Sequence, residues 1–498
     1  MLKEAKLPLF LFWNVIFAKD IQGMDWSASY LMGILYWLYW IVVVSVMIRV
    51  VLRNHDTVKT LAWIMVFVFI PFLGLLLYFF FGRNTRKKRV AGKRLMSQIK
   101  QRGAFGSISR VKREIPDEYQ SLATFFENTS SASLLPFDDA EVISDTRLFA
   151  ERLFEMIYAA ENHIHLQFYI IEDDDFGRRL RDAIVEKARQ GVEVRLIYDS
   201  VGCWKVRGKF FESMRSAGVQ VEEFLKVYFP LLSNRVNYRN HRKVVVVDGK
   251  VGMVGGCNIA DRYLRGIKGS TWRDTMLLLH GAAVNGLQAA FAVDWYFANR
   301  ILISGERYFP LVGCGGKSYV QVVTSNPVGD VRTIVAGYMK ILSQAKSHVY
   351  LQTPYFMPDE AFLQALKSCA MSGVDVRLMI PEHSDSVVAD YAAMSHLGAL
   401  LNSGVKIYLY RGGMLHAKTV VCDGNLSSVG STNLDSRSFF YNFEVSAFVY
   451  DKAVANDMQE VFLNDMKLCH RLTVNEYRHR PIYRRCVESF VKLFSPLL

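Results

Sequence analysis

The chain has 498 residues, a net charge of +13 and a hydrophobic content of 51%, which is high for a soluble enzyme. That length allows two ordinary domains or one large pseudo-symmetric domain. The seven cysteines include no C-x-x-C pair, which argues against a disulfide framework and against a zinc site, so we expect a reducing compartment.

The first predicted elements are membrane segments. Residues 26–48 and 60–82 carry no charged side chain, and each run exceeds the roughly 20 residues that a transmembrane helix needs. Both are predicted to span a membrane, with buried core helices as the alternative. Pro71 and Gly74 are expected to bend the second span. Residues 1–25 contain a shorter apolar run, which favours an interfacial segment over a signal peptide.

A basic stretch follows the second predicted span. Residues 83–113 hold 12 Lys or Arg and no acidic residue. Beside a membrane, such a stretch indicates contact with anionic lipid or a flank that only fixes topology. Because the loop between the spans has fewer positive residues, the positive-inside rule places both ends of the chain in the cytoplasm. We expect residues 83–135 to form a basic juxtamembrane segment and linker.

The rest of the chain contains two similar series of predicted elements. A strand, a charged helix and a second strand follow one another over residues 163–196, and again over residues 348–378. This order indicates βαβ units with parallel pairing. We therefore predict an α/β fold with two pseudo-symmetric lobes, residues 136–315 and 316–470.

Each predicted lobe contains one copy of the pattern H-x-K-x-x-x-x-D. The two copies consist of His241, Lys243 and Asp248, and of His416, Lys418 and Asp423. Each copy is followed by a small-residue turn, with Asn258 or Asn433 at 17 positions after its His. Because the spacing is the same in both, each copy is predicted to supply half of one phosphodiester-handling site.

The residue types of the motif suit displacement at phosphorus. One His can be the nucleophile, and the other can give and take protons near neutral pH. The Lys ammonium groups and the Asn amides can hold the phosphate oxygens as charge grows on them, so no metal or other cofactor is required. Asp248 and Asp423 each precede a Gly, which leaves two roles open, a site residue or a turn residue.

Each motif His also needs an acceptor for its other ring nitrogen. The candidates are Asp274 and Glu444, which lie 33 and 28 positions after the His of their own lobe. A surface or ion-paired carboxylate is the alternative for either. The other histidines near predicted strands, His163, His165 and His348, are expected to be packing residues.

Residues 471–498 are predicted to form an amphipathic tail. Apolar residues recur there at helical spacing, with Arg484, Arg485 and Lys492 nearby. Two positions fit this pattern, a membrane surface or the side of the enzyme core.

With these residues in view, the chain resembles the phospholipase D superfamily and, within it, the membrane-anchored bacterial cardiolipin synthases. The paired motif is typical of the superfamily. The flanking segments that narrow the resemblance lie within residues 63–82, 237–243, 272–275, 354–359, 414–418, 430–438 and 495–498. Ser325-Asn326-Pro327 departs from the expected Ser-Gly-Pro. This departure affects the shape of a loop between the halves, away from the motifs.

The resemblance implies two phospholipase D-like lobes with the active site between them, preceded by two transmembrane helices in a bacterial inner membrane. It implies that one phosphatidylglycerol gives its phosphatidyl group to His241, that His416 is the general acid and base, and that a second phosphatidylglycerol attacks to give cardiolipin and glycerol. The expected partners are phosphatidylglycerol and anionic lipid, not nucleic acid. The alternatives are a membrane-tethered phospholipase D or nuclease that uses water, and a non-catalytic lipid-binding or scaffold protein.

Overall fold

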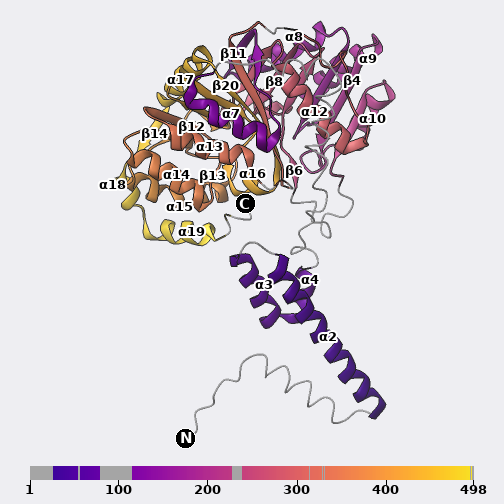
Figure 1. Ribbon diagram of the computed structural model, residues 1–498, viewed down its shortest axis with the longest axis vertical. Helices are drawn as coiled ribbons and strands as arrows, with labels where there is room; N and C mark the ends of the chain where they lie inside the picture. The colour runs from indigo at the N-terminus through magenta and orange to yellow at the C-terminus, as the bar shows by residue number, and fades with distance from the viewer. Residues whose placement is uncertain are drawn as a thin grey trace. The chain divides into compact units, whose positions relative to one another are not determined.

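The structure of the chain is a computed structural model (Figure 1). It describes residues 26–53, 57–78, 115–226, 238–267, 269–312, 315–327, 329, 331–493 and 495. The expected interfacial segment 1–25 and the basic stretch 83–113 lie outside the described residues. The chain divides into two compact units, one with the N-terminal helices and the other with the body that carries both motifs.

The N-terminal unit contains α2 (Trp26–Arg53), α3 (Thr57–Phe69) and α4 (Pro71–Leu77). Only α2 is long and apolar enough to cross a membrane among the helices described, over Gly33–Leu52. The expected second helix over residues 60–82 is not continuous, because the chain leaves the helical conformation at Ile70 and α4 starts afresh at Pro71. Proline lacks the N–H that a continuous helix would need there. Gly74 lets α4 approach α3, since a Cβ atom would lie 3.1 Å from the Val66 carbonyl oxygen.

The body contains two large mixed sheets. From edge to edge the seven-stranded sheet consists of β2 (Asp139–Ile143), β10 (Met276–His280), β8 (Val251–Gly255), β7 (Val244–Val247), β3 (His163–Phe168), β4 (Glu193–Asp199) and β5 (Gln220–Phe224). β3, β4 and β5 pair in parallel and the remaining neighbours are antiparallel. The predicted parallel βαβ pairing of β3 with β4 is confirmed.

The ten-stranded sheet repeats this order. It consists of β1 (Leu135–Phe137), β11 (Ser318–Ser325), β20 (Asn442–Tyr450), β18 (Leu426–Gly430), β17 (Thr419–Cys422), β12 (His348–Gln352), β14 (Asp375–Pro381), β15 (Lys406–Tyr410) and β21 (Cys469–Leu472), with β6 (Arg239–Asn240) paired to β20. Parallel β12, β14 and β15 correspond to β3, β4 and β5. Because the hairpin β17–β18 corresponds to β7–β8, each motif leads into the same strand of its own sheet.

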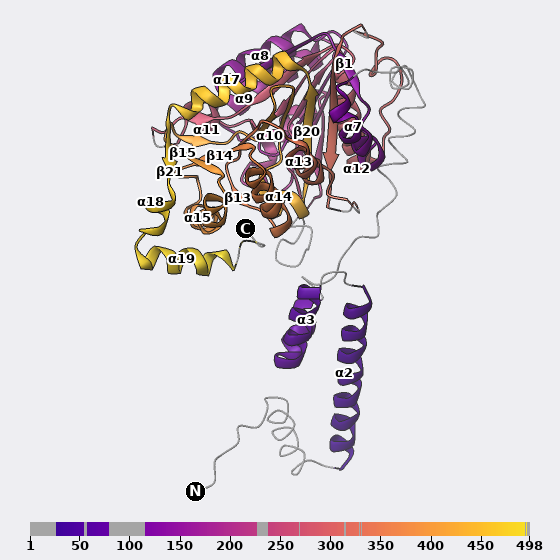
Figure 2. The ribbon, with the colours of Figure 1, turned by 60° about the vertical axis from the view of Figure 1, so that its left-hand side comes forward.

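The two sheets face each other across a shared apolar core (Figure 2). That core includes Val244 and Val246 of the first sheet and Val421 and Val429 of the second. The helices α12 (Val284–Asn299) and α17 (Lys452–Met466) each contact strands of both sheets. The outer faces are covered by α8 (Thr146–Ala159), α9 (Asp175–Arg189) and α10 (Gly208–Ser216) on the first sheet, and by α7 (Asp117–Ser130), α13 (Thr333–Gln344), α14 (Glu360–Met371) and α15 (Val387–Asn402) on the second.

The prediction of a linker up to residue 135 is wrong for its last part. Residues Asp117–Ser130 form α7, whose Leu122 and Phe126 are fully buried in the core of the second sheet. β1 then pairs with β11 of that sheet. The apolar residues at positions 119, 122, 123 and 126 have helical spacing, so the signal was present in the sequence.

Candidate active site

Two short parallel ladders cross between the halves of the body. β6, which precedes His241, pairs with the start of β20, and β16 (Met414–Leu415), which precedes His416, pairs with β9 (Trp272–Arg273). The ladders continue into the motifs, because the His241 N–H donates to the Phe443 carbonyl at 2.9 Å and the His416 N–H donates to the Arg273 carbonyl at 2.7 Å. Each motif His is thereby fixed to the backbone of the other half.

The crossing brings each His to a carboxylate of the other half. Nδ1 of His241 lies 3.1 Å from both carboxylate oxygens of Glu444. Nδ1 of His416 lies 2.5 Å from Oδ2 of Asp274. The sequence-based assignment of Asp274 and Glu444 to the His of their own lobe is therefore corrected, because the pairs form crosswise. With Nδ1 held by a carboxylate, Nε2 is the nitrogen left to react with a substrate.

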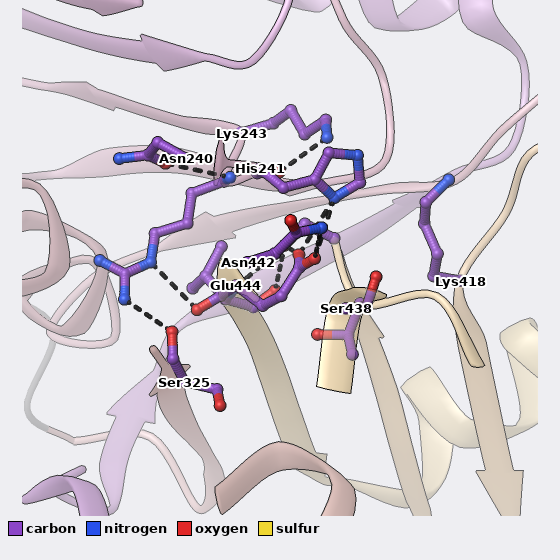
Figure 3. A network of polar contacts seen from close by, with 12 residues as sticks. Asn240, His241, Lys243, Ser325, Lys418, Ser438, Asn442 and Glu444 are labelled. Atoms are coloured by element: carbon purple, nitrogen blue, oxygen red, sulfur yellow. Dashed lines mark hydrogen bonds and ion pairs between the residues drawn. The ribbon is translucent and has the colours of Figure 1, made fainter. Parts of the chain in front are cut away.

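The two motif lysines lie in the same buried region. Lys243 Nζ donates to the His241 carbonyl at 2.7 Å, and Lys418 Nζ donates to the His416 carbonyl. Figure 3 shows Lys243 and Lys418 on either side of the His241 ring. The Tyr169 ring meets His241 edge to face at 4.9 Å and lies 5.4 Å from Lys243 Nζ. The two motifs thus converge on one site, and Tyr169, which the sequence analysis did not single out, is part of it.

Burial sets the charge of the two imidazoles. It lowers the pKa of His241 below its ordinary value, against the opposing charge of Glu444. It lowers the pKa of His416 to about 3, with the Lys418 charge acting in the same direction and Asp274 against it. Both rings are therefore neutral at neutral pH, with Nδ1–H donated to the carboxylate and a lone pair on Nε2.

The lysines and carboxylates form a balanced set of buried charges. Burial, and then the charge of Lys418, lowers the pKa of Lys243 to about 7. Burial lowers the pKa of Lys418 to about 8. Burial alone would raise the pKa of Asp274 and Glu444, but the nearby cationic groups outweigh it and lower both. The site therefore holds two carboxylates and two lysines. An added anion would stabilise the charged form of the lysines.

Different neighbours position the two carboxylates. Glu444 accepts from the Ser431 hydroxyl and from the Asn442 amide, the latter at 3.0 Å. The position equivalent to Ser431 in the first half is Gly256, where a Cβ atom would lie 2.0 Å from Oδ1 of Asp274. The small-residue turns that follow each motif thus shape the carboxylate pockets, a role that the sequence analysis missed.

Two buried arginines fix the carbonyl groups of the same acids. Arg242 donates to the Glu444 carbonyl at 3.0 Å and to Asp294 of α12 at 2.6 Å. Arg273 donates to the Asp274 carbonyl and, at 3.1 Å, to Asp465 of α17. One contact of each arginine joins the two halves. For Arg242 it is the bond to the Glu444 carbonyl, and for Arg273 it is the bond to Asp465. Both arginines lie in positions adjacent to site residues, but their spacing gave no sign of this role.

Asp248 and Asp423 belong to turns and not to the site. Asp248 accepts from the backbone N–H groups of residues 161–163, and Asp423 from those of residues 346–348, at 2.8–2.9 Å. Both have a positive φ at the tip of a hairpin, at the opposite end of β7 or β17 from the motif Lys. Four strand residues span roughly 13 Å. Their inclusion among the catalytic residues is therefore corrected in favour of the turn role.

The two motif-linked asparagines differ from one another. Asn258 Oδ1 accepts from the Ile170 N–H at 3.1 Å, and its amide donates to the Tyr263 hydroxyl at 2.5 Å. Asn433 is buried, and its Oδ1 has no hydrogen-bond partner among the described residues. Asn258 thus holds Tyr263 beside His416, whose ring Tyr263 meets edge to face.

The remaining histidines considered in the sequence have packing positions. His163 and His165 are fully buried in β3, and the His165 ring stacks on Phe291. His348 begins β12 at the Asp423 end of the sheet. Within the described part of the chain, no group of three or more His, Cys, Asp or Glu side chains is arranged to hold a metal ion.

Comparison with known proteins identifies the family of both halves. Residues 153–295 and 338–466 match the family described as "Cardiolipin synthase, PLD-like domain", and residues 34–83 match "Phospholipase_D-nuclease N-terminal". The chain is 38% identical to "Major cardiolipin synthase ClsA" of Bacillus subtilis (strain 168), over 94% of this chain and 99% of that protein. It is also 38% identical to "Cardiolipin synthase" of Geobacillus thermodenitrificans (strain NG80-2), over 95% of this chain and 96% of that protein.

A solved structure shows the same fold. Phosphatidylserine synthase of Haemophilus influenzae Rd KW20 superimposes with a TM-score of 0.59 at 13% identity, covering 76% of this chain and 98% of that chain. The expected architecture of two phospholipase D-like lobes is confirmed by these matches.

The close approach at Gly256 predicts the effect of one added methyl group. We expect Gly256→Ala to displace the Asp274 carboxylate and with it His416, because the new Cβ would overlap Oδ1. A displacement of about 1 Å in a catalytic group can cost roughly 10²-fold in rate. The measurement is kcat of the purified variant, with Gly208→Ala as the control, since a Cβ at Gly208 meets open space. Wild-type kcat in Gly256→Ala would contradict the crosswise pairing as a requirement for activity.

Proposed function

The chain belongs to the cardiolipin synthases, a family of phosphatidyltransferases within the phospholipase D superfamily, and from this premise we propose how it acts. It transfers the phosphatidyl group of one phosphatidylglycerol to a second one, and the products are cardiolipin and glycerol. The observation that carries the proposal is the crosswise pairing of His241 with Glu444 and of His416 with Asp274 beside two buried lysines.

The first half-reaction forms a phosphohistidine. Nε2 of neutral His241 attacks phosphorus, the P–N bond forms, and the bond from phosphorus to the glycerol headgroup oxygen breaks. His416 donates its proton to that leaving oxygen. The anionic phosphodiester itself favours the imidazolium of His416, because an opposite charge nearby raises the pKa that burial lowers. Lys243, Lys418 and Asn433 hold the nonbridging oxygens as negative charge grows on them.

The second half-reaction reverses these roles. The terminal hydroxyl of a second phosphatidylglycerol gives its proton to His416, its oxygen attacks phosphorus, and the P–N bond to His241 breaks. Asp274 and Glu444 keep each imidazole in the tautomer with hydrogen on Nδ1. The two lobes, residues 136–315 and 316–470, each contribute one His, one Lys and one carboxylate. Neither lobe alone therefore contains a complete His–carboxylate pair.

The substrate lipid implies a position in the membrane. We place α2, and α3 with α4, as two passes through a bacterial cell membrane, with the catalytic body on the cytoplasmic face. Support comes from the apolar stretch Gly33–Leu52 and from the 12 positive residues in 83–113 against three in residues 49–59, between the two charge-free runs.

The proposed reaction predicts products that hydrolysis would not give. Purified full-length protein in liposomes with labelled phosphatidylglycerol should produce cardiolipin and glycerol, separated by lipid chromatography. His241→Ala and His416→Ala should each lower this activity by at least roughly 10²–10⁴-fold, since each removes a reacting group. The control is His280→Ala, because His280 lies at the end of β10 remote from Asp274.

A covalent adduct decides the assignment of the two histidines. After an acid-free quench of the wild-type reaction, mass spectrometry should find a phosphatidyl group on His241. Phosphatidic acid as the main product would contradict the synthase and favour a hydrolase. An adduct on His416 would reverse the roles of the two histidines.

The lowered pKa values of the lysines predict the pH profile. With pKa values of about 7 and about 8, Lys243 and Lys418 lose their charge as the pH rises through this range in the free enzyme. The value of kcat/KM should therefore fall as pH rises from 7 to about 9. The fall in kcat should come at higher pH, because the bound phosphodiester raises both pKa values. A kcat/KM that stays level up to pH 9 would show that the lysines do not titrate in this way.

The proposed topology predicts which side of the membrane is accessible. In inside-out membrane vesicles, added protease should cleave the catalytic body, whereas intact spheroplasts should protect it. Cleavage from the outside of intact spheroplasts would place the body on the opposite face.

A further inference from the structure

The C-terminal helix α19 (Ile482–Lys492) turns its apolar side away from the protein. At 3.6 residues per turn, the apolar residues of α19 other than Val491 fall, together with Leu493, on one arc of about 140°. These side chains are strongly exposed: Ile482 77%, Tyr483 63%, Val487 40%, Phe490 63% and Leu493 73%. In an ordinary surface helix this arc would face the core.

The opposite side of α19 holds it to the body. Glu488 is buried and accepts from Arg480 at 2.6 and 3.2 Å. Val491 packs against the cluster formed by Met357, Ala389 and Ala392. The helix therefore packs against α15 through the side that carries Val491, while Glu488 bonds locally to Arg480 just before the helix, and the side chains of the apolar arc stay solvent-exposed.

Exposed apolar residues of a second helix extend this surface. Val387 and Val388 at the start of α15 are 67% and 47% exposed. They directly precede Ala389, which packs beside Val491. We call the exposed residues of α19, Leu493, Val387 and Val388 the apolar face.

Positive charges flank the apolar face. Arg484, Arg485 and Lys492 are exposed and lie on the remaining arc of α19, beside the apolar residues. An amphipathic helix with an apolar face and a basic border binds the interface of a bilayer that contains anionic lipid. A protein partner would need a complementary acidic rim, whereas a bilayer with phosphatidylglycerol supplies both an apolar layer and negative headgroups.

The apolar face connects to the active site through the fold. Met357, beneath Val491, belongs to β13 (Phe356–Met357), which pairs with β19 (Leu434–Asp435) directly after Asn433. In Figure 1, α19 and β6, which leads to His241, lie on the same lower side of the body, and in Figure 2 α19 runs along the lower end of α15.

We propose that the apolar face is an interfacial membrane-binding surface, specific for bilayers with anionic phospholipid, that seats the active site on the lipid surface. It acts in addition to the membrane-spanning helices. Burial of the exposed side chains in the acyl boundary provides the binding energy, and the basic border selects anionic headgroups. Membrane binding by the apolar face does not depend on the proposed function. Only its role, the delivery of phospholipid to the site, rests on that function.

Cys486 lies within the apolar arc and is exposed, so it can carry an environment-sensitive fluorophore. Labelled full-length protein is reconstituted at low density into liposomes of phosphatidylcholine with phosphatidylglycerol. Bromine-labelled acyl chains should quench the fluorophore strongly and aqueous iodide weakly. Cys486→Ser, labelled in parallel, gives the background from other cysteines. This measurement needs no turnover, so its failure is distinct from a failure of the proposed reaction.

Variants separate the apolar and basic contributions. The triple change Ile482→Ser, Phe490→Ser and Leu493→Ser should lose most of the quenching by bromolipid in liposomes that contain phosphatidylglycerol. It should also lower the ratio of activity on bilayers to activity on monomeric short-chain phosphatidylglycerol. Arg484→Gln with Arg485→Gln should reduce quenching only where phosphatidylglycerol is present. The control is Tyr158→Ser, which removes a 55% exposed aromatic residue from α8.

Three outcomes would overturn the proposal. One is a fluorophore that iodide reaches freely in phosphatidylglycerol liposomes. Another is equal quenching by bromolipid in the wild type and the triple variant. The third is protection from iodide that rises with protein density and not with lipid composition, which would identify a second copy of the chain as the occupant.

Discussion

The structure depends on the exchange of backbone and side-chain contacts between the two halves at the motif histidines. Each His donates its N–H to a carbonyl of the opposite half and holds a carboxylate from that half at Nδ1. Arg242 and Arg273 add further hydrogen bonds between the halves, to the Glu444 carbonyl and to Asp465. Because both imidazoles take their orientation from the other lobe, the lobes must stay in one relative position for either ring to be aligned. The shared valine-rich core between the sheets meets that demand.

The crossing also produces a buried site that contains several charged side chains. Burial opposes the charged form of each lysine and each imidazole, and the carboxylates Asp274 and Glu444 act against this effect. Buried cations that lack full compensation are costly for stability. An incoming phosphodiester favours the charged form of both lysines, because its negative charge opposes the effect of burial on them. The site thus gives up some stability of the free protein in favour of substrate binding, and the neutral imidazoles remain ready to react.

Local patterns predicted the elements of the fold well, and they failed where the result depended on packing. The parallel strand pairs and the hairpins after each motif follow from alternation, Gly positions and Asp-Gly turns. The helix α7 was missed although the spacing of Tyr119, Leu122 and Phe126 was helical, because few apolar residues stand out in that segment. The break at Pro71 turned an expected long helix into two short ones. The same residue that suggested a bend was sufficient to end the helix.

The sequence by itself determined which side chains could form the site, because two identical spacings of His and Lys are visible without any structure. It also determined the family and an apolar helix in α2 long enough to cross a membrane. For Asp248 and Asp423 it offered the turn role as one of two alternatives. Only the tertiary structure decided which carboxylate serves which His, since the partners are 203 and 142 positions apart. Spacing along a chain predicts contacts within one element or between neighbours. A contact between lobes depends on how two sheets pack, and the near symmetry of the repeats made pairing within a lobe and pairing across lobes indistinguishable until that packing was known.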